Sequence, residues 1–237
     1  QFPELSNLTL TANGDIISNS GIFLTGDGSG SIGNLSLTSV LGEINLASNF
    51  ITIGGTVSIN ADGNITVPNN LRVSGDVSAT SNQGVISLGD LFITTINGST
   101  GDGSVDVIAN GDITVGGGLS TGGGDISLTS ENGSISVTNS IESGARNVNS
   151  TTTEAGDVFL SAVNGDVVFN FIQTANFAGI DTAGDVTIQA GRNVRGTGTT
   201  VLGPSQPTLL ASGGALTIIH GGGPTLPFNV GDASVNG

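Results

Sequence analysis

The sequence predicts an all-β protein, a parallel β-helix in which short strands stack coil upon coil. Three observations lead to this prediction. A five-residue unit recurs along almost the whole chain, its copies are separated by alternating short and long steps, and good helix formers are scarce. Of the 237 residues 40 are glycine, and β-branched residues, Asn and Ser dominate much of the remainder. We therefore expect almost no α-helix.

The repeated unit reads glycine, small polar residue, aliphatic residue, any residue, aliphatic residue. Clear copies are residues 42–46 (GEINL), 63–67 (GNITV), 111–115 (GDITV), 124–128 (GDISL) and 184–188 (GDVTI). The aliphatic residues at the third and fifth positions point to one side of an extended chain, which is typical of a strand with one buried face. Each copy is too short for an ordinary hairpin or sandwich, so the unit favours a solenoid.

The spacing of the copies predicts the size of one coil. Units that begin at 33, 42, 55, 63 and 75 are separated by steps of 9, 13, 8 and 12 residues, so a pair of units forms a period of about 20 to 22 residues. Later periods lengthen to between 28 and 32 residues. Eight full coils are predicted, with residues 14–16 entering a ninth, which gives about 8–9 coils and a rod on the order of 40 Å long. No linker interrupts the pattern, so we expect one domain over 1–237.

Glycine followed by Asp marks the expected corners between faces. Asp112, Asp125, Asp157, Asp166 and Asp185 all follow a glycine at the start of a unit. We expect the glycine to supply a positive φ at the corner and the Asp to accept local backbone N–H groups.

Departures from the minimal coil predict irregular loops over 138–155 and 192–212, and a cap or lead into a next segment over 220–237. Loops on a rigid scaffold often carry binding specificity, although tolerated surface decoration explains them equally well. Phe159 occupies an outward position, so either the 138–155 loop covers it or it belongs to an exposed apolar patch. Val167, Phe169 and Phe171 are expected to form an inward stack.

Charge excludes several classes of partner. The four basic residues are Arg72, Arg146, Arg192 and Arg195, and 19 acidic residues bring the net charge to −15. Such a chain repels nucleic acid and anionic lipid. Its longest apolar runs, such as 215–219, fall far short of the ~20 residues of a membrane helix.

The chain has no Cys, and we expect Gln1 to be a boundary or a processed end because no secretory signal follows it.

Several patterns approach known chemistry without completing it. Residues 28–33 (GSGSIG) match a dinucleotide fingerprint, but a strand-like stretch follows where a helix is needed. Asp102, Asp106 and Asp112 hint at calcium without the required register, so only adventitious calcium is expected. His220 is the single His, so neither a Ser-His-Asp triad nor a His-based metal site could be built with much redundancy, and it is expected to lie in an exposed turn. No catalytic, cofactor-binding or metal residue is assigned, and no cofactor is expected.

Hydroxyl side chains occupy many outward positions. They form one expected column, which could order water as in ice-binding β-helices or simply solubilise the rod: Ser58, Thr66, Ser78, Thr114, Ser127, Ser136 and Thr187. We favour the solubilising interpretation, because ice-binding faces usually need Thr at two outward positions per strand.

Residues 124–128 (GDISL) and 190–194 (AGRNV) resemble the repeats of filamentous haemagglutinin-like proteins, large adhesins exported by two-partner secretion. Residues 217–222 (TIIHGG) and 227–233 (PFNVGDA) are similar to cyanobacterial members. The resemblance implies a right-handed β-helix located outside the cell or on its surface. The family's secretion domain with its Asn-Pro-Asn motifs does not occur here, so the segment would belong to the shaft.

The resemblance leads us to expect a non-catalytic structural or adhesive shaft segment, with a carbohydrate-binding or polysaccharide-cleaving β-helix module as the alternative. The expected partners are neighbouring segments of the same protein, end-to-end copies of this chain, or surface glycans and other cells. Neither nucleic acid nor membrane insertion is expected. Acids converging in one groove would favour the alternative, because glycoside cleavage uses paired carboxylates.

Overall fold

A computed structural model describes residues 7–24, 33–46, 51–67, 70–94, 103–144, 155–174, 183–198, 209–210 and 214–221. All regular structure in these ranges is β-strand, as the composition predicted. Every strand pairing in them is parallel. The fold is therefore a parallel β-helix.

Each coil has three faces. The first strands of the coils form one nine-stranded sheet, here called the front sheet: β1 (Asn7–Ala12), β4 (Asn34–Ser39), β7 (Val57–Ala61), β10 (Val77–Ser81), β13 (Val105–Ala109), β16 (Ile126–Ser130), β18 (Val158–Ala162), β20 (Val186–Ala190) and β23 (Leu216–His220). Because successive coils add strands in register, this sheet runs the whole length of the described rod.

The other two faces carry shorter strands. The second face holds β2 (Ile16–Ser18), β5 (Ile44–Leu46), β8 (Ile65–Val67), β11 (Ile86–Leu88), β14 (Ile113–Val115), the starts of β17 (Ile135–Glu142) and β19 (Val167–Gln173), and β21 (Val194–Gly196). The third face holds β3 (Ile22–Leu24), β6 (Ile51–Ile53), β9 (Leu71–Val73), β12 (Leu91–Ile93), β15 (Leu119–Ser120), the ends of β17 and β19, and β22 (Leu209–Leu210). Since β17 and β19 continue from one face to the next, the two faces join into one 14-stranded sheet.

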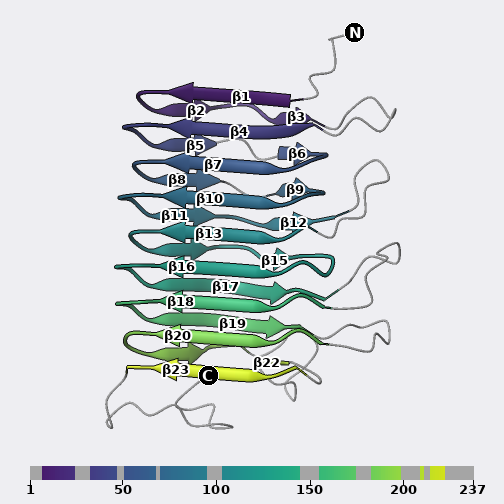
Figure 1. Ribbon diagram of the computed structural model, residues 1–237, viewed down its shortest axis with the longest axis vertical. Helices are drawn as coiled ribbons and strands as arrows, with labels where there is room; N and C mark the ends of the chain where they lie inside the picture. The colour runs from purple at the N-terminus through teal and green to yellow at the C-terminus, as the bar shows by residue number, and fades with distance from the viewer. Residues whose placement is uncertain are drawn as a thin grey trace.

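The helix is right-handed. In Figure 1 the front strands run to the left, the strands behind them run to the right, and the chain descends from β1 to β23. In the part of the chain that the structure describes, eight coils carry strands on all three faces and β23 opens a ninth, which agrees with the predicted total of about 8–9 coils. The prediction of which coil is partial was wrong: the N-terminal coil begins at β1 and is complete, with residues 14–16 at its corner with the second face, whereas the coil that starts at 214 is described only through β23.

The spacing of the repeated unit predicted the strands of only two of the three faces. Copies of the five-residue unit form most of the front and second faces. The third face consists of short strands, most of which do not complete the unit, such as Leu71–Val73. Residues 89–93 (GDLFI), which contain Leu91–Ile93 of the third face, are an exception because they match the unit. Register partners on the front sheet are as close in sequence as Val57 and Val77 and as distant as Ile126 and Val158. The period therefore varies from 20 to 32 residues while the coil geometry stays constant.

Inward aliphatic side chains form the core, and at each inward position of a strand every coil contributes one side chain to a column along the rod. On the second face a column of five isoleucines is fully buried, with 0% exposure each: Ile44, Ile65, Ile86, Ile113 and Ile135. Full burial of such a side chain contributes roughly 1.5–3 kcal/mol, so each coil stabilises its two neighbours. The core is a continuous stack rather than a set of separate clusters.

The additional residues of the long periods lie in the sequence mainly between the third face and the front sheet, where the chain enters the next coil. We call this the entry corner. Buried hydroxyls bond across it: Ser143 Oγ donates to the Gly156 carbonyl at 2.5 Å and Thr174 Oγ1 donates to the Gly184 carbonyl at 2.6 Å. Each bond joins the end of one coil to the start of the next, so consecutive coils stay connected at this corner.

Both predicted loops are shorter than expected. Residues 138–142 belong to β17, where one extra residue between Val137 and Ser140 shifts the register against β19. Within 192–212, residues 194–196 and 209–210 are strands β21 and β22. The corner between two faces is rich in Ser, Thr and Asn, a composition that is also typical of loops, and this is why strand residues were predicted as loop. Residues 145–154, 199–208 and 211–212 of the predicted loops, and residues 222–237 of the predicted cap, lie outside the described residues.

The predicted inward stack of aromatic residues is correct for two members. Val167 and Phe169 are buried in the core, at 0% and 1% exposure. Phe171 is also buried, at 7% exposure, but it lies past the corner on the third face in register with Ser140, and Ile172 rather than Phe171 joins the core cluster. The corner changes which side chains point inward, so the period-2 rule fails there.

Corner glycines are required by space and not by φ. None of the described glycines that begin a unit has a left-handed φ. Among the described glycines a left-handed φ occurs at Gly123, where it is 134°, and this residue precedes the unit. A Cβ on Gly165 would instead lie 2.0 Å from the Gly133 carbonyl oxygen of the preceding coil. The expectation of a positive φ was therefore wrong, because coil stacking brings consecutive corner backbones too close for a Cβ at most of these glycines.

Candidate functional site

The outer surface of the front sheet is the most regular surface of the rod. Two outward side chains per strand form two columns along the axis. The first column is Thr9, Ser36, Ser58, Ser78, Asp106, Ser127, Phe159, Thr187 and Thr217. The second is Thr11, Thr38, Asn60, Thr80, Ile108, Thr129, Ser161, Gln189 and Ile219. Twelve of these 18 positions carry a hydroxyl, and Asp106 is their single charge.

The predicted single hydroxyl column is divided between two faces. Ser58, Ser78, Ser127 and Thr187 belong to the first column of the front sheet, as given above, whereas the other three lie on the second face: Thr66, Thr114 and Ser136. The five-residue unit occurs on both faces, so its fourth position marks two separate surfaces. The front sheet consequently has two outward columns rather than one.

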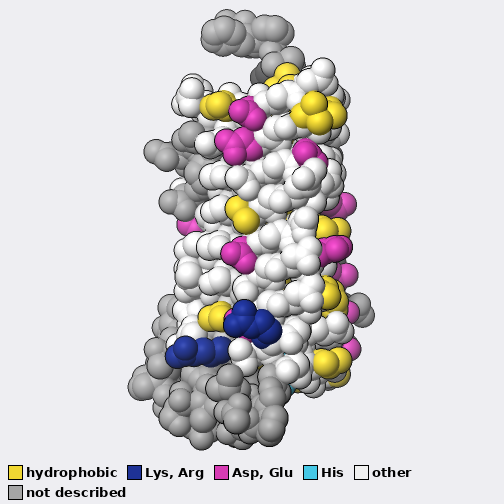
Figure 2. Space-filling model, turned by 90° about the vertical axis from the view of Figure 1, so that its left-hand side faces the viewer, with side chains coloured by type: hydrophobic (Ala, Val, Ile, Leu, Met, Phe, Trp, Pro, Cys, Tyr) yellow, Lys and Arg dark blue, Asp and Glu magenta, His cyan; other side chains and the backbone are white. Residues whose placement is uncertain are grey.

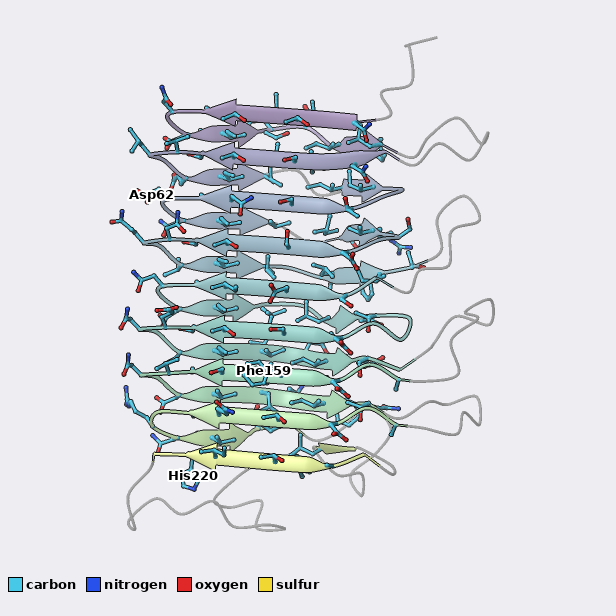
Figure 3. The ribbon with its side chains drawn as sticks, viewed as in Figure 1. Asp62, Phe159 and His220 are labelled. Carbon is cyan, nitrogen blue, oxygen red and sulfur yellow. The ribbon has the colours of Figure 1, made fainter. Side chains whose placement is uncertain are left out.

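Phe159 points outward from β18, as predicted, and Figure 3 labels it on the front sheet. Its register neighbours are Ser127 on one side and Thr187 on the other. The ring is half-buried, while the flanking Val158 and Leu160 are buried inside at 1% and 0% exposure. Ser161, two residues along the same strand, is 7% exposed. Whether the 138–155 loop covers the ring or the ring belongs to an exposed apolar patch stays a prediction, because residues 145–154 lie outside the described residues.

Side-chain oxygens at the entry corner bond to the backbone of the following coil. Asp76 Oδ1 accepts the Ser104 N–H at 2.9 Å. Further along the rod, Asp125 Oδ1 accepts the Asp157 N–H at 2.8 Å, and Asp157 Oδ1 accepts the Asp185 N–H at 2.7 Å. We call this row the entry ladder. The expectation of local N–H bonds was wrong, because each bond connects equivalent residues of consecutive coils.

A second row lies at the exit corner, where the front sheet meets the second face. Asp15 Oδ1 accepts the Glu43 N–H at 3.0 Å, Asp112 Oδ1 accepts the Ser134 N–H at 2.7 Å, and Asp166 Oδ1 accepts the Asn193 N–H at 3.0 Å. We call this row the exit ladder. Arg192 also lies 3.4 Å from the Asp166 carboxylate. Figure 2 faces this corner and shows acidic side chains spaced along it, with basic ones near the C-terminal end.

The calcium candidates do not come together. Asp106 points outward from the front sheet, Asp112 belongs to the exit ladder, and Asp102 lies outside the described residues. In the part of the chain that the structure describes, no group of three or more Asp, Glu, His or Cys side chains is placed to hold a metal ion.

The other candidates lie on strands. Of the fingerprint-like residues 28–33, only Gly33 is described, and it precedes strand β4 rather than a helix. His220 ends β23 in register with Ala190 and is half-buried (Figure 3), so its expected place in an exposed turn was wrong. It takes an inward position that Ala and Ser hold in the earlier coils.

The described residues contain no helix long and apolar enough to span a membrane. Comparison of the chain with protein-family models, curated proteins and solved structures finds no match.

Proposed function

We propose that this chain is a structural shaft segment of a large extracellular or cell-surface protein of the filamentous haemagglutinin-like type, with an adhesive rather than a catalytic role. The observation that carries the proposal is the uninterrupted front sheet, in which nine strands stack in register and ladder bonds connect the corners. Such a stack separates its two ends by a fixed distance, which is the property that a shaft needs.

The N-terminal coil supports a neighbouring β-helical segment as partner. Leu10 is 44% exposed, although it points inward in register with Leu37, which is 1% exposed. Leu8, Ile16 and Ile22 are likewise only partly buried against the core. A further coil stacked on this end would bury the four side chains and pair the strand edges beside them. We propose a neighbouring segment of the same protein, or another copy of this chain, as that coil.

A non-catalytic role fits the placement of the described carboxylates. The ladder acids already accept backbone N–H groups, and Asp106 stands among hydroxyls with no second carboxylate in its column. Polysaccharide cleavage by paired carboxylates would need two acids facing one sugar. Turnover of any polysaccharide in a hydrolase and lyase screen would refute this part of the proposal.

Distance measurements between paired spin labels test the shaft itself. The chain has no Cys, so Thr11→Cys with Ile219→Cys places one label on each end strand of the front sheet at outward positions. Eight strand spacings predict a narrow distance distribution centred near about 38 Å. The shorter pair Thr11→Cys with Thr129→Cys spans five spacings and should give about 24 Å.

A ratio of the two distances far from eight to five, or broad distributions for both pairs, would show that the chain is not a rigid rod. Labelling of intact source cells by antibodies against the chain tests the surface location separately. Signal only after permeabilisation would contradict that location while leaving the rod unaffected.

A further inference from the structure

We propose that the front sheet binds a neutral polysaccharide chain around Phe159. The inference deepens the adhesive part of the proposed function and rests on it. The site, here called the Phe159 patch, comprises six of the eight outward side chains of β13, β16, β18 and β20: Asp106, Ser127, Thr129, Phe159, Thr187 and Gln189. The other two are Ile108, which is 36% exposed, and Ser161, which is 7% exposed.

The charge distribution selects a neutral ligand. The entry and exit ladders border the front sheet on its two long sides with acids such as Asp125, Asp157 and Asp166. Between them the outward surface carries the single charge of Asp106, in a chain whose net charge is −15. An anionic polymer would be repelled along both borders, whereas a neutral polymer meets no such penalty.

The side chains on the surface match the two sides of a sugar ring. A sugar presents hydroxyls at its edge and C–H groups on its faces, so it needs hydrogen-bonding partners beside an apolar platform. Ser127 and Thr187 flank Phe159 in its column, and Gln189 and Asp106 add a longer amide and a carboxylate at the ends of the patch. Hydroxyls serve as both donors and acceptors, as sugar hydroxyls do.

The dimensions of the surface favour a chain laid along the rod. Strands follow each other at about 4.8 Å, and a five-residue strand spans about 13 Å between the two corners. A single extended glycan placed along the columns would therefore meet new hydroxyls at every coil and remain between the acidic borders. The aromatic ring provides one fixed point on an otherwise repeating surface.

Phe159 is the outlier that indicates binding rather than solubility. Ser or Thr holds seven of the nine positions of the first column, and a solubilising surface would gain nothing from a phenyl ring there. The ring does not serve the core, because Val158 and Leu160 of the same strand fill the inward positions. A partly buried aromatic ring among polar neighbours offers a large apolar contact area on which binding energy can concentrate.

Pull-down by insoluble cellulose, chitin, β-1,3-glucan, xylan and mannan tests the proposal, with affinities for soluble oligosaccharides of any positive glycan measured by calorimetry. Wild-type protein should bind at least one of these neutral glycans and should not bind dextran sulfate. Phe159→Ser restores the residue type of the column and should weaken binding by about tenfold, as loss of an aromatic hot spot does. Thr187→Asp adds charge beside the ring and should weaken it further.

Phe92→Ser is the matched control, because Phe92 is also an outward, half-buried Phe but lies on the third face. Equal effects of the two Phe substitutions, binding to none of the five glycans, or a preference for dextran sulfate would each overturn the proposal. Inhibition of ice growth without glycan binding would assign the surface to ordered water instead. Unchanged spin-label distances in the Phe159→Ser variant keep failure of binding separate from failure of the shaft.

Discussion

Substitution of corner glycines by alanine tests how the coils stack, and three equivalent positions form a graded series. Gly14, Gly63 and Gly165 all lie at the exit corner, in the first, third and seventh coils. A Cβ on Gly14 would meet nothing within 4 Å, because no described coil precedes it. On Gly63 it would lie 3.2 Å from the Gly42 carbonyl oxygen, and on Gly165 it would lie 2.0 Å from that of Gly133.

The magnitude follows from these contacts. Gly165→Ala forces two backbones apart by more than an ångström, which as overpacking costs about 1–3 kcal/mol. The same movement strains two hydrogen bonds at the corner, Arg192 N–H to the Gly165 carbonyl and Asp166 N–H to Ser134 Oγ, worth about 1 kcal/mol each. If straining removes about half of the contribution of each bond, the total loss is about 2–4 kcal/mol, which corresponds to a fall in Tm of about 5–15 °C.

The other two variants set the scale. Gly63→Ala needs a shift of a few tenths of an ångström and should cost about 1 kcal/mol or less. Gly14→Ala should leave stability unchanged or raise it by about 0.4–1 kcal/mol, because alanine restricts the unfolded chain. Urea and thermal unfolding followed by circular dichroism give the order. Equal destabilisation by all three substitutions would refute the close-approach explanation and return the requirement for glycine to the backbone angles.

Two further predictions concern the hydrogen bonds that join coils. Asp157→Ala should lower the free energy of unfolding by about 1 kcal/mol in urea titrations, because the Asp185 N–H loses its acceptor, whereas Asp157→Asn keeps an oxygen there and should match the wild type. Destabilisation by both variants alike would mean that the charge, and not the bond, stabilises this corner. Ser130→Ala should cost about 1 kcal/mol, because its hydroxyl bonds to two corner backbones, and Ser130→Val should cost more by overfilling a position that alanine holds in adjacent coils. A valine variant as stable as the alanine variant would contradict the tight packing inferred for that column.

The strands of two faces could be predicted from the sequence because their signal is local. An aliphatic residue on each side of a polar one, after a glycine, describes both a strand and its corner, and residues 42–46 or 124–128 show this without reference to the rest of the chain. Most strands of the third face do not complete the unit, so Leu71–Val73 could not be predicted from it. An aliphatic-x-aliphatic triplet within several of the long steps was the available signal, and residues 89–93 (GDLFI) even match the unit itself.

The reasons for the corner residues could not be predicted from one unit. Whether Gly165 is needed for its φ or for its lack of a Cβ depends on the distance to Gly133, 32 positions earlier in the chain. The partner of Asp157 is likewise the backbone of another coil. Positions were therefore predicted correctly while the physical causes were not.

The candidate binding surface was predicted only in part. The outward position of Phe159 followed from alternation within its own strand. The double column around it did not, because identical units form two faces and nothing within a unit distinguishes one face from the other. Thr129 and Gln189 lie one position beyond the unit, so they were not considered as surface residues.

The ladders at the corners have a direction, and it bears on how the rod is built. In each bond the oxygen belongs to the earlier coil and the N–H to the later one, as from Asp125 to Asp157 and from Asp157 to Asp185. When the chain emerges with its N-terminus first, each new coil therefore meets a preceding coil whose acceptor oxygens are already in place. The rod can then fold one coil at a time from its N-terminal end, before the C-terminal residues have emerged.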